Sequence, residues 1–241
     1  MNTISVWFAE KWDAFVLDFT NNFITDNRWQ YLAFGLLRTL EITFFAVIIG
    51  IVLGFLVAVI RSAHDQTGKL KFLNAVCRVY LTVIRGTPVV IQLMIIYYVI
   101  FATVNVDKTV AAVIAFGINS GAYVAEIVRA GIMSIDQGQF EAGRSLGFTY
   151  AKTMWYIVIP QAFKNVLPAL ANEFITLLKE TSVSGYIATQ DLTKGGDIIR
   201  SRTFSAFMPL IAVALIYLAM VMLLSAGVTK LERRMRRCDI R

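Results

Sequence analysis

Four polar side chains interrupt long apolar stretches of this chain. Asn119, Ser120 and Tyr123 fall midway along one such stretch, and Glu173 falls within another. A polar group in an apolar surrounding is costly unless it is hydrogen-bonded, paired or in contact with water. An amide and a hydroxyl can supply neutral hydrogen bonds, a tyrosine an aromatic face, and a carboxylate a counter-charge. We therefore predict that these four residues form a binding site for a polar solute, in which Glu173 favours a cationic group.

Glu173 also has a purely structural interpretation. Two basic residues of the same stretch, Lys164 and Lys179, lie nine and six positions away. Side chains of one helix meet at offsets of three or four, so neither lysine lies squarely on the face of Glu173. A pairing partner from another segment stays open as the alternative to solute contact.

Arg85 and Glu126 form a second polar group within apolar stretches. We expect these two side chains to make a structural ion pair rather than to contact a solute, since a buried charge needs a partner. Arg129 lies three positions after Glu126, on the same helix face, and can share the carboxylate.

The sequence lacks the motifs of covalent, metal-dependent and ATP-hydrolysing catalysis. Its single histidine, His64, lies in a polar loop, and its two cysteines, Cys77 and Cys238, form no metal or redox pattern. Neither HExxH nor GxSxG occurs. The phrases QTGKL (66–70) and GFTYAKT (147–153) lack the GxxxxGK spacing of a phosphate-binding loop. We predict no catalytic residue, no metal site and no cofactor on this chain.

The composition is that of a membrane protein. Hydrophobic residues make up 57% and charged residues only 16% of the 241 positions, whereas soluble domains have about 45–50% and about 25%. Residues 42–60 form a run of 19 without a charge, which as a helix can cross roughly 30 Å of hydrocarbon. Apolar length and periodicity predict an all-α integral membrane protein with one transmembrane domain, residues 31–229. Its five predicted spans are about 31–60, 77–104, 109–130, 156–178 and 205–229.

Lysine and arginine are divided unequally between the two sides that these spans define. One side carries thirteen and the other seven, with three more inside the spans. The richer side comprises residues 61–80, 129–155 and the basic tail 230–241. Cytoplasmic loops are enriched in these residues, so we expect the N-terminus outside and the C-terminus in the cytoplasm. The tail explains most of the net charge of +7, so this charge does not indicate nucleic-acid binding.

The segment 1–30 precedes the first span and differs from a secretory signal peptide, because acidic residues are scattered through it. Aromatic and apolar side chains follow helical spacing at Trp12, Phe15, Phe19 and Phe23. An amphipathic helix of this kind suits the outer membrane interface. Packing against the other spans is the alternative.

The fourth predicted span contains Pro168, and we expect this proline to break its helix. The polar connection that follows, about 179–204, is predicted to fold over the outer mouth of the protein. Irregular backbone at membrane depth is tolerated only where it lines protein or a water-filled cavity.

The longest cytoplasmic loop, about 131–155, is polar yet regular. Its part IDQGQFEAGRSL (135–146) is too polar to cross a membrane and predicts a short helix, which Gly147 ends. A second amphipathic piece, TYAKTMWYIVI, runs to Pro160, which ends or kinks it. A helix displayed below the membrane at a fixed angle to the spans can serve as a handle for another protein.

This loop resembles the conserved motif of the permease subunits of ABC importers, which reads Glu-Ala-Ala, three residues, Gly, nine residues, Ile-x-Leu-Pro. Here the motif consists of Glu141-Ala142-Gly143, then Gly147, then Ile157 to Pro160. Gly143 replaces the third residue and Ile159 the leucine. Further stretches are similar to the polar amino-acid branch of the family: RGTPVVIQ (85–92), INSGAYVAEIVRAGI (118–132), SIDQGQFEA (134–142), LPALANEF (167–174) and LLKETS (177–182).

The resemblance covers about residues 31–237 and implies a type I ABC importer permease fold. It implies that Glu141, Ala142, Gly143 and Gly147 belong to a coupling helix that docks in a groove of a cytoplasmic ATPase dimer, which binds ATP and Mg²⁺. The other implied partners are a second permease subunit, identical or different, an extracytoplasmic solute-binding protein and membrane lipid. The implied activity is import of a polar amino acid by alternating access across the cell membrane of a prokaryote.

Two other classes of function and one choice of substrate remain as alternatives. A secondary amino-acid transporter or channel without an ATPase would not need the coupling motif. An intramembrane enzyme would need a nucleophile–base pair or metal ligands in the spans. Within the ABC class, Glu173 favours arginine, lysine or histidine, and glutamine, glutamate or another polar solute is the alternative.

Overall fold

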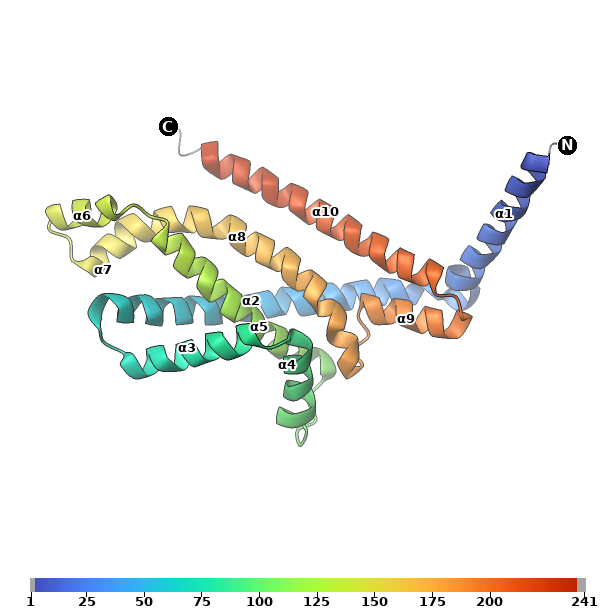
Figure 1. Ribbon diagram of the computed structural model, residues 1–241, viewed down its shortest axis with the longest axis horizontal. Coiled ribbons are helices and arrows are strands. Elements are labelled where there is room, and N and C mark those ends of the chain that lie inside the picture. The colour runs from blue at the N-terminus through green and yellow to red at the C-terminus, as the bar shows by residue number, and fades with distance from the viewer. Residues whose placement is uncertain (1–2, 238–241) are drawn as a thin grey trace.

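The computed structural model describes residues 3–237, and that part of the chain is folded into helices without a strand (Figure 1). Cys238 and the last three residues of the basic tail lie outside the described residues. The helices are α1 Thr3–Phe19, α2 Trp29–Thr67, α3 Lys71–Gly86, α4 Val89–Ile95, α5 Lys108–Met133, α6 Gln137–Ser145, α7 Tyr150–Thr153, α8 Ile159–Glu180, α9 Leu192–Thr203 and α10 Phe207–Arg237. Shorter helical turns at 20–27, 96–100, 154–158 and 181–187 link them.

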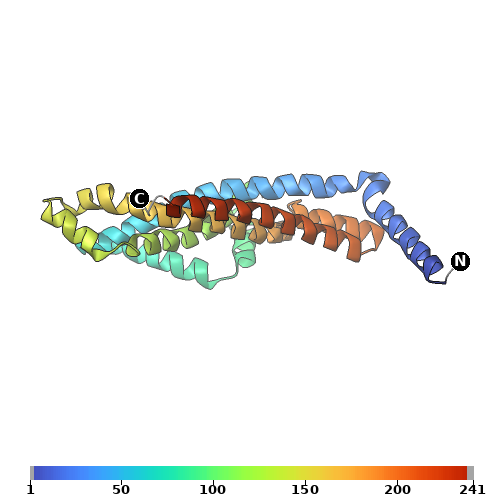
Figure 2. The same cartoon turned by 90° about the horizontal axis from the view of Figure 1, so that it is seen from above.

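The long helices lie along one axis of an elongated molecule (Figures 1 and 2). The short helices α6 and α7 form one end, and α1 projects from the other end. Within residues 3–237, three helices are long and apolar enough to cross a membrane: Trp29–Asp65, Lys108–Met133 and Phe207–Met235. The pair Lys71–Gly86 and Val89–Ile100, bent by 111°, meets the same test when its two parts are taken together.

Helices α2 and α5 pack tightly and run in the same direction. Gly50 of α2 faces Ser120 of α5, and one turn later Gly54 faces Val124. Small residues at this spacing allow two helix backbones to approach closely. Because both helices run the same way, the chain between them must return across the membrane through the bent pair α3 and α4.

Helix α8, which corresponds to the fourth predicted span, is less apolar and is not among the helices that pass the test of length and apolarity. It starts beside α6 and α7, and the α9 helix that follows it lies against the first part of α2. There the Leu192 amide donates a hydrogen bond to Thr39 Oγ1 at 3.1 Å. Helix α10 then runs back toward the α6 end. The order of α2, the pair α3 and α4, α5, α8 and α10 follows the order of the five predicted spans, of which three helices and the bent pair pass the test of length and apolarity.

The predicted break at Pro168 is wrong. Pro168 lies inside α8, which continues from Ile159 to Glu180. Pro160 does not end a helix either, since it stands in the first turn of α8, where a missing amide hydrogen is least costly. The break lies instead between α3 and α4, where Thr87 adopts the extended conformation that a following proline favours.

The connection between α8 and α10 is ordered and largely helical. Asp191 caps α9, and its carboxylate accepts hydrogen bonds from the amides of Thr193 and Lys194. Burial raises the pKa of Asp191 to about 6, against the lowering effect of these bonds. On the exposed side of α9, hydrogen bonds from Lys194 and Arg200 lower the pKa of Asp197.

The N-terminal segment forms the amphipathic helix that its spacing predicts. Trp12 stacks on Phe15 with ring centroids 5.8 Å apart, Phe15 stacks on Phe19 at 6.4 Å, and Phe19 contacts Phe23 at 5.1 Å. Of these rings only Phe23 is buried. Helix α1 extends away from the other helices (Figures 1 and 2), so its aromatic face is uncovered in the single chain.

Candidate functional site

The centre of the molecule holds a polar contact between α5 and α8. The Ser120 hydroxyl donates a hydrogen bond to Glu173 Oε1 at 2.9 Å. Asn119 is 3% exposed, Ser120 0% and Glu173 9%. The structure thus brings two of the predicted binding residues into direct contact and gives Glu173 a partner from another helix rather than from its own.

Asn119 points toward α4 instead of α8. Its Nδ2 donates a hydrogen bond of 3.0 Å to Oε1 of Gln92, which is buried. Gln92 is not among the predicted site residues. It ends the stretch RGTPVVIQ, and a glutamine within an otherwise apolar helix is the feature that could have identified it.

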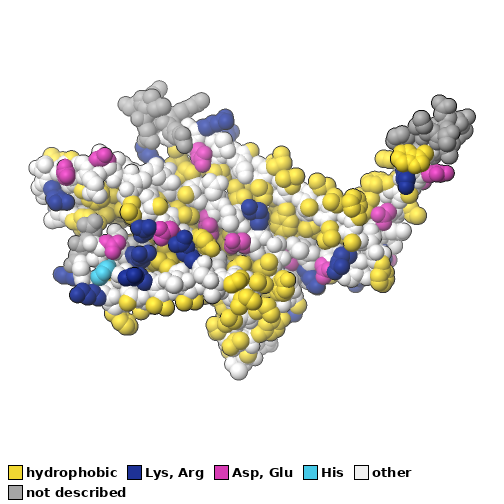
Figure 3. Space-filling view, viewed as in Figure 1, with side chains coloured by type: hydrophobic (Ala, Val, Ile, Leu, Met, Phe, Trp, Pro, Cys, Tyr) yellow, Lys and Arg dark blue, Asp and Glu magenta, His cyan; other side chains and the backbone are white. Residues whose placement is uncertain are grey.

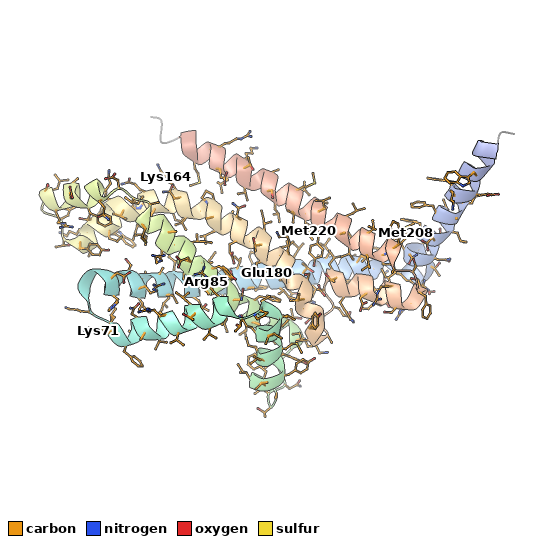
Figure 4. All side chains as sticks on the ribbon, in the orientation of Figure 1. Lys71, Arg85, Lys164, Glu180, Met208 and Met220 are labelled. Carbon is orange, nitrogen blue, oxygen red and sulfur yellow. The ribbon has the colours of Figure 1, made fainter. Side chains whose placement is uncertain are left out.

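Tyr123 lies apart from this group. It is 36% exposed, and the guanidinium carbon of Arg85 lies 5.8 Å from its ring centroid. Figure 4 places Arg85 at the end of α3, near the crossing of α2 and α5. The three predicted binding residues on α5 therefore face three different helices. Asn119 faces α4, Ser120 faces Glu173 on α8, and Tyr123 faces α3.

Glu126 is held mainly by its own helix. Arg129 donates to Glu126 Oε1 at 2.5 Å, whereas the Arg85 guanidinium lies 3.8 Å from Glu126 Oε2. The predicted pair Arg85–Glu126 is present, but the closer partner is Arg129. All three side chains are partly exposed in the single chain. Among the described residues, no group of three or more histidine, cysteine or acidic side chains could hold a metal ion.

The predicted loop helix is α6, and it displays one face. Glu141 and Ala142 are exposed, whereas Gly143 is buried against α7. A methyl group on Gly143 would meet Thr153 Oγ1 at 2.5 Å and Thr153 Cγ2 at 2.6 Å. Thr153 therefore fills the space that a side chain at position 143 would need. Beside it, the rings of Phe140 and Tyr150 stack with centroids 6.2 Å apart.

Gly147 ends α6 through its backbone conformation. Its φ is +76°, in the left-handed region that glycine adopts without strain. The Phe148 amide donates to the Gly143 carbonyl at 3.0 Å, and the Gly147 amide to the Arg144 carbonyl at 2.9 Å. These two bonds form the Schellman motif that satisfies the last carbonyls of a helix. The predicted helix end at Gly147 is confirmed.

Comparison with known proteins identifies this architecture. Residues 50–237 match the family described as the binding-protein-dependent transport system inner membrane component. The chain is an ABC importer permease of this family. This permease is 38% identical over 205 residues to the glutamine transport system permease protein GlnP of Escherichia coli K12, covering 84% of this chain and 91% of that protein.

Two further matches extend over most of this permease. The arginine transport system permease protein ArtQ of Bacillus subtilis (strain 168) is 38% identical over 207 residues, 85% of this chain and 92% of that protein. A crystal structure of an amino acid ABC transporter with histidines matches with a TM-score of 0.80 and 43% identity, over 88% of this chain and 98% of that chain. The fold is that of a type I ABC importer permease, as predicted, and a secondary transporter or channel is not favoured.

In this permease, α8 joins the polar centre to the loop helix. Gln161 of α8 donates to Gln139 Oε1 of α6 at 3.4 Å, and Asn165 donates to Ser134 Oγ at 2.9 Å. Glu173 lies twelve residues after Gln161 on the same helix, a rise of about 18 Å. A displacement of α6 can therefore reach the Ser120–Glu173 contact through one continuous helix.

Proposed function

We propose that this permease imports polar amino acids, cationic ones among them, by alternating access. Relatives whose names specify glutamine and arginine transport are equally similar to it, at 38% identity, and they support the amino-acid class. The observation that favours a cationic substrate is the carboxylate of Glu173, which is buried at the centre of the molecule with a neutral partner.

The proposed energy source is ATP, bound with Mg²⁺ by a separate cytoplasmic ATPase dimer. Helix α6 is the proposed docking element, with Glu141 and Ala142 exposed toward the ATPase and Gly143 and Gly147 fixing the helix on α7. The support is geometric: α6 is exposed at one end of the molecule, and a hydrogen bond between Gln139 and Gln161 links it to α8.

The remaining proposed partners are a second permease subunit and an extracytoplasmic solute-binding protein. We place the N-terminus outside and the α6 end in the cytoplasm of a prokaryotic cell. On the face drawn in Figure 3, lysine and arginine gather in the half of the molecule that contains α6 and α7. This distribution follows the enrichment of basic residues on the cytoplasmic side.

The test is ATP-driven uptake into proteoliposomes that contain the permease, its ATPase and its binding protein, with ATP enclosed. We expect radiolabelled L-arginine or L-glutamine to accumulate only with ATP and binding protein present. Competition among L-arginine, L-lysine, L-histidine, L-glutamine and L-glutamate would then rank the substrates. Uptake that continues without the ATPase, or no uptake of any of these amino acids, would contradict the proposed function.

A further inference from the structure

The break between α3 and α4 leaves backbone carbonyls without helical partners. Helix α3 ends at Gly86, and Pro88 has no amide hydrogen to offer. Each helix end has carbonyls that need donors from elsewhere, and inside a membrane water cannot supply them. Here two side chains supply the donors. The Thr87 hydroxyl donates to the Val83 carbonyl at 2.8 Å, and the Gln92 amide donates to the carbonyl of Ile84.

The orientation of the Gln92 amide follows from its three neighbours. Its Nε2 donates to the Ile84 carbonyl at 2.7 Å and to the Thr87 carbonyl at 3.0 Å. It also lies 2.8 Å from Thr87 Oγ1, whose hydrogen is used on Val83. All three neighbours can only accept, so the nitrogen and not the oxygen of the amide must face them.

The opposite end of the same amide then fixes Asn119. Because Nε2 faces the break, Oε1 of Gln92 faces α5 and accepts from Asn119 Nδ2 at 3.0 Å. An acceptor at this place requires the nitrogen of the Asn119 amide. The oxygen, Asn119 Oδ1, is the atom left for a further donor. The orphan carbonyls of α3 thus set the polarity of a side chain on α5.

We propose that Gln92 is a positioning residue that presents Asn119 Oδ1 as an acceptor for the α-ammonium group of the amino acid. The inference rests on the proposed function, since it names the part of the substrate that Asn119 recognises. A reversed Asn119 amide would instead present two N–H donors and would favour the α-carboxylate. The amide of Gln92 therefore decides which charged group of the substrate this side of α5 accepts.

The experiment compares the affinity of the purified permease–ATPase complex, without binding protein, for an amino acid and for its amine-lacking analogue. The probes are L-arginine with 5-guanidinopentanoate and L-glutamine with glutaramate, used for whichever amino acid the uptake assay shows to be carried. We expect the wild type to bind the amino acid at least tenfold more tightly than the analogue. In Gln92→Met the Asn119 amide can rotate, and this ratio should fall to about twofold.

Two further variants separate this positioning effect from a structural one. Thr87→Val disturbs the same break but leaves both backbone carbonyls to orient Gln92, so it should keep the wild-type ratio. Asn119→Asp loses the donor to Gln92 but keeps an acceptor, and should also discriminate against the analogue. A Gln92→Met variant that loses affinity for both ligands equally would overturn the proposal, as would an Asn119→Asp variant without discrimination.

The outcome for the wild type keeps the two proposals distinct. ATP-driven uptake of an amino acid, together with equal binding of the amine-lacking analogue, would overturn the role of Gln92 and leave the proposed function standing. Absence of uptake in the proteoliposome assay would reject the proposed function itself.

Discussion

The Ser120 hydroxyl on α5 donates its hydrogen to the Glu173 carboxylate on α8, across 2.9 Å in the buried centre of the permease. A neutral hydroxyl satisfies one carboxylate oxygen but does not balance its charge. A carboxylate in this setting gains most from a cation, because a charge away from water is costly without a counter-charge. The contact therefore holds α5 and α8 together while leaving Glu173 able to attract a cationic ligand.

Replacing Glu173 with glutamine tests this interpretation. Glutamine keeps the size of the side chain and an oxygen for the Ser120 hydroxyl but removes the charge. We expect uptake of L-arginine and L-lysine to fall by about tenfold, the loss that one charge-assisted contact implies, while uptake of L-glutamine changes little. The measurement is competitive uptake in proteoliposomes.

Ser120→Ala is the matched control, since it removes the donor and retains the charge. It should reduce uptake of cationic and neutral amino acids to a similar extent. If the wild type ignores cationic amino acids, or if Glu173→Gln loses all substrates equally, Glu173 does not select the substrate.

Gly147→Val tests the coupling helix. Valine at φ +76° is strained, by about 1–2 kcal/mol, although no atom outside residues 146–148 lies within 4 Å of the position where its Cβ would be placed. We expect ATP-driven uptake and substrate-stimulated ATP hydrolysis to be lost while the permease remains in the membrane. Gly147→Asn should retain more activity, because asparagine tolerates this conformation.

The chain offers a matched control at the end of α2. Gly68 also has a positive φ, +65°, and open space around it. Gly68→Val should strain the backbone to a similar degree but keep ATP-driven uptake, because Gly68 lies outside α6. Equal loss of uptake in both valine variants would point to general destabilisation, and normal uptake in Gly147→Val would reject α6 as the coupling helix.

Local features of the sequence predicted the loop helix well. Its start and end depend on neighbours in sequence: Asp136 caps the first turn through the Gly138 amide, and Gly147 supplies the positive φ at the end. The helix break was not predictable in the same way. A proline interrupts a helix only where the preceding residue leaves the helical region, as Thr87 does, and α8 runs through Pro168.

The polar centre could be predicted only as a set of residue types. The sequence indicates Asn119, Ser120 and Glu173 because a polar group at membrane depth is costly unless it has a structural or functional role. Their pairing depends on contacts between positions far apart in sequence: Ser120 and Glu173 are 53 residues apart, and Asn119 and Gln92 are 27 apart. No local pattern specifies such contacts, which explains why Gln92 was missed.

Glu126 should be more important to stability than either of its arginine partners singly. Glu126→Gln removes the counter-charge that Arg85 and Arg129 share, and it should lower the melting temperature of the purified permease more than Arg85→Gln does. The decrease in melting temperature for Arg129→Gln should lie between these two. Arg129 is 2.5 Å from the Glu126 carboxylate, whereas Arg85 is 3.8 Å from it. Because these side chains are partly exposed, each substitution should change the free energy of unfolding by at most about 1 kcal/mol. Equal melting temperatures for all three variants would contradict this ranking.

The proposed orientation can be tested with single cysteines in a chain that lacks Cys77 and Cys238. Gln30 and Lys152 are both exposed and lie toward opposite ends of the long axis, next to α1 and in α7. An impermeant thiol reagent applied to intact cells should label a cysteine at position 30 and not one at position 152. After lysis both should react. Labelling of position 152 alone on intact cells would show that the orientation is the opposite of the one proposed.

The aromatic face of α1 should lie in the outer leaflet of the membrane. Trp12 is 66% exposed and belongs to the ring stack that continues to Phe23, whereas Trp7 is 53% exposed and lies beneath the ammonium group of Lys11. The two tryptophans are five positions apart, so they are separated by about 140° around the helix. An interfacial helix should therefore insert Trp12 among the lipids and leave Trp7 at the water side.

In permeases that retain only one tryptophan, with phenylalanine at the other three positions, brominated lipids should quench Trp12 strongly and acrylamide should quench Trp7. If both tryptophans respond equally to the two quenchers, or if brominated lipids leave Trp12 unchanged, α1 does not lie on the membrane in this orientation, and packing against protein becomes the better explanation of its apolar face.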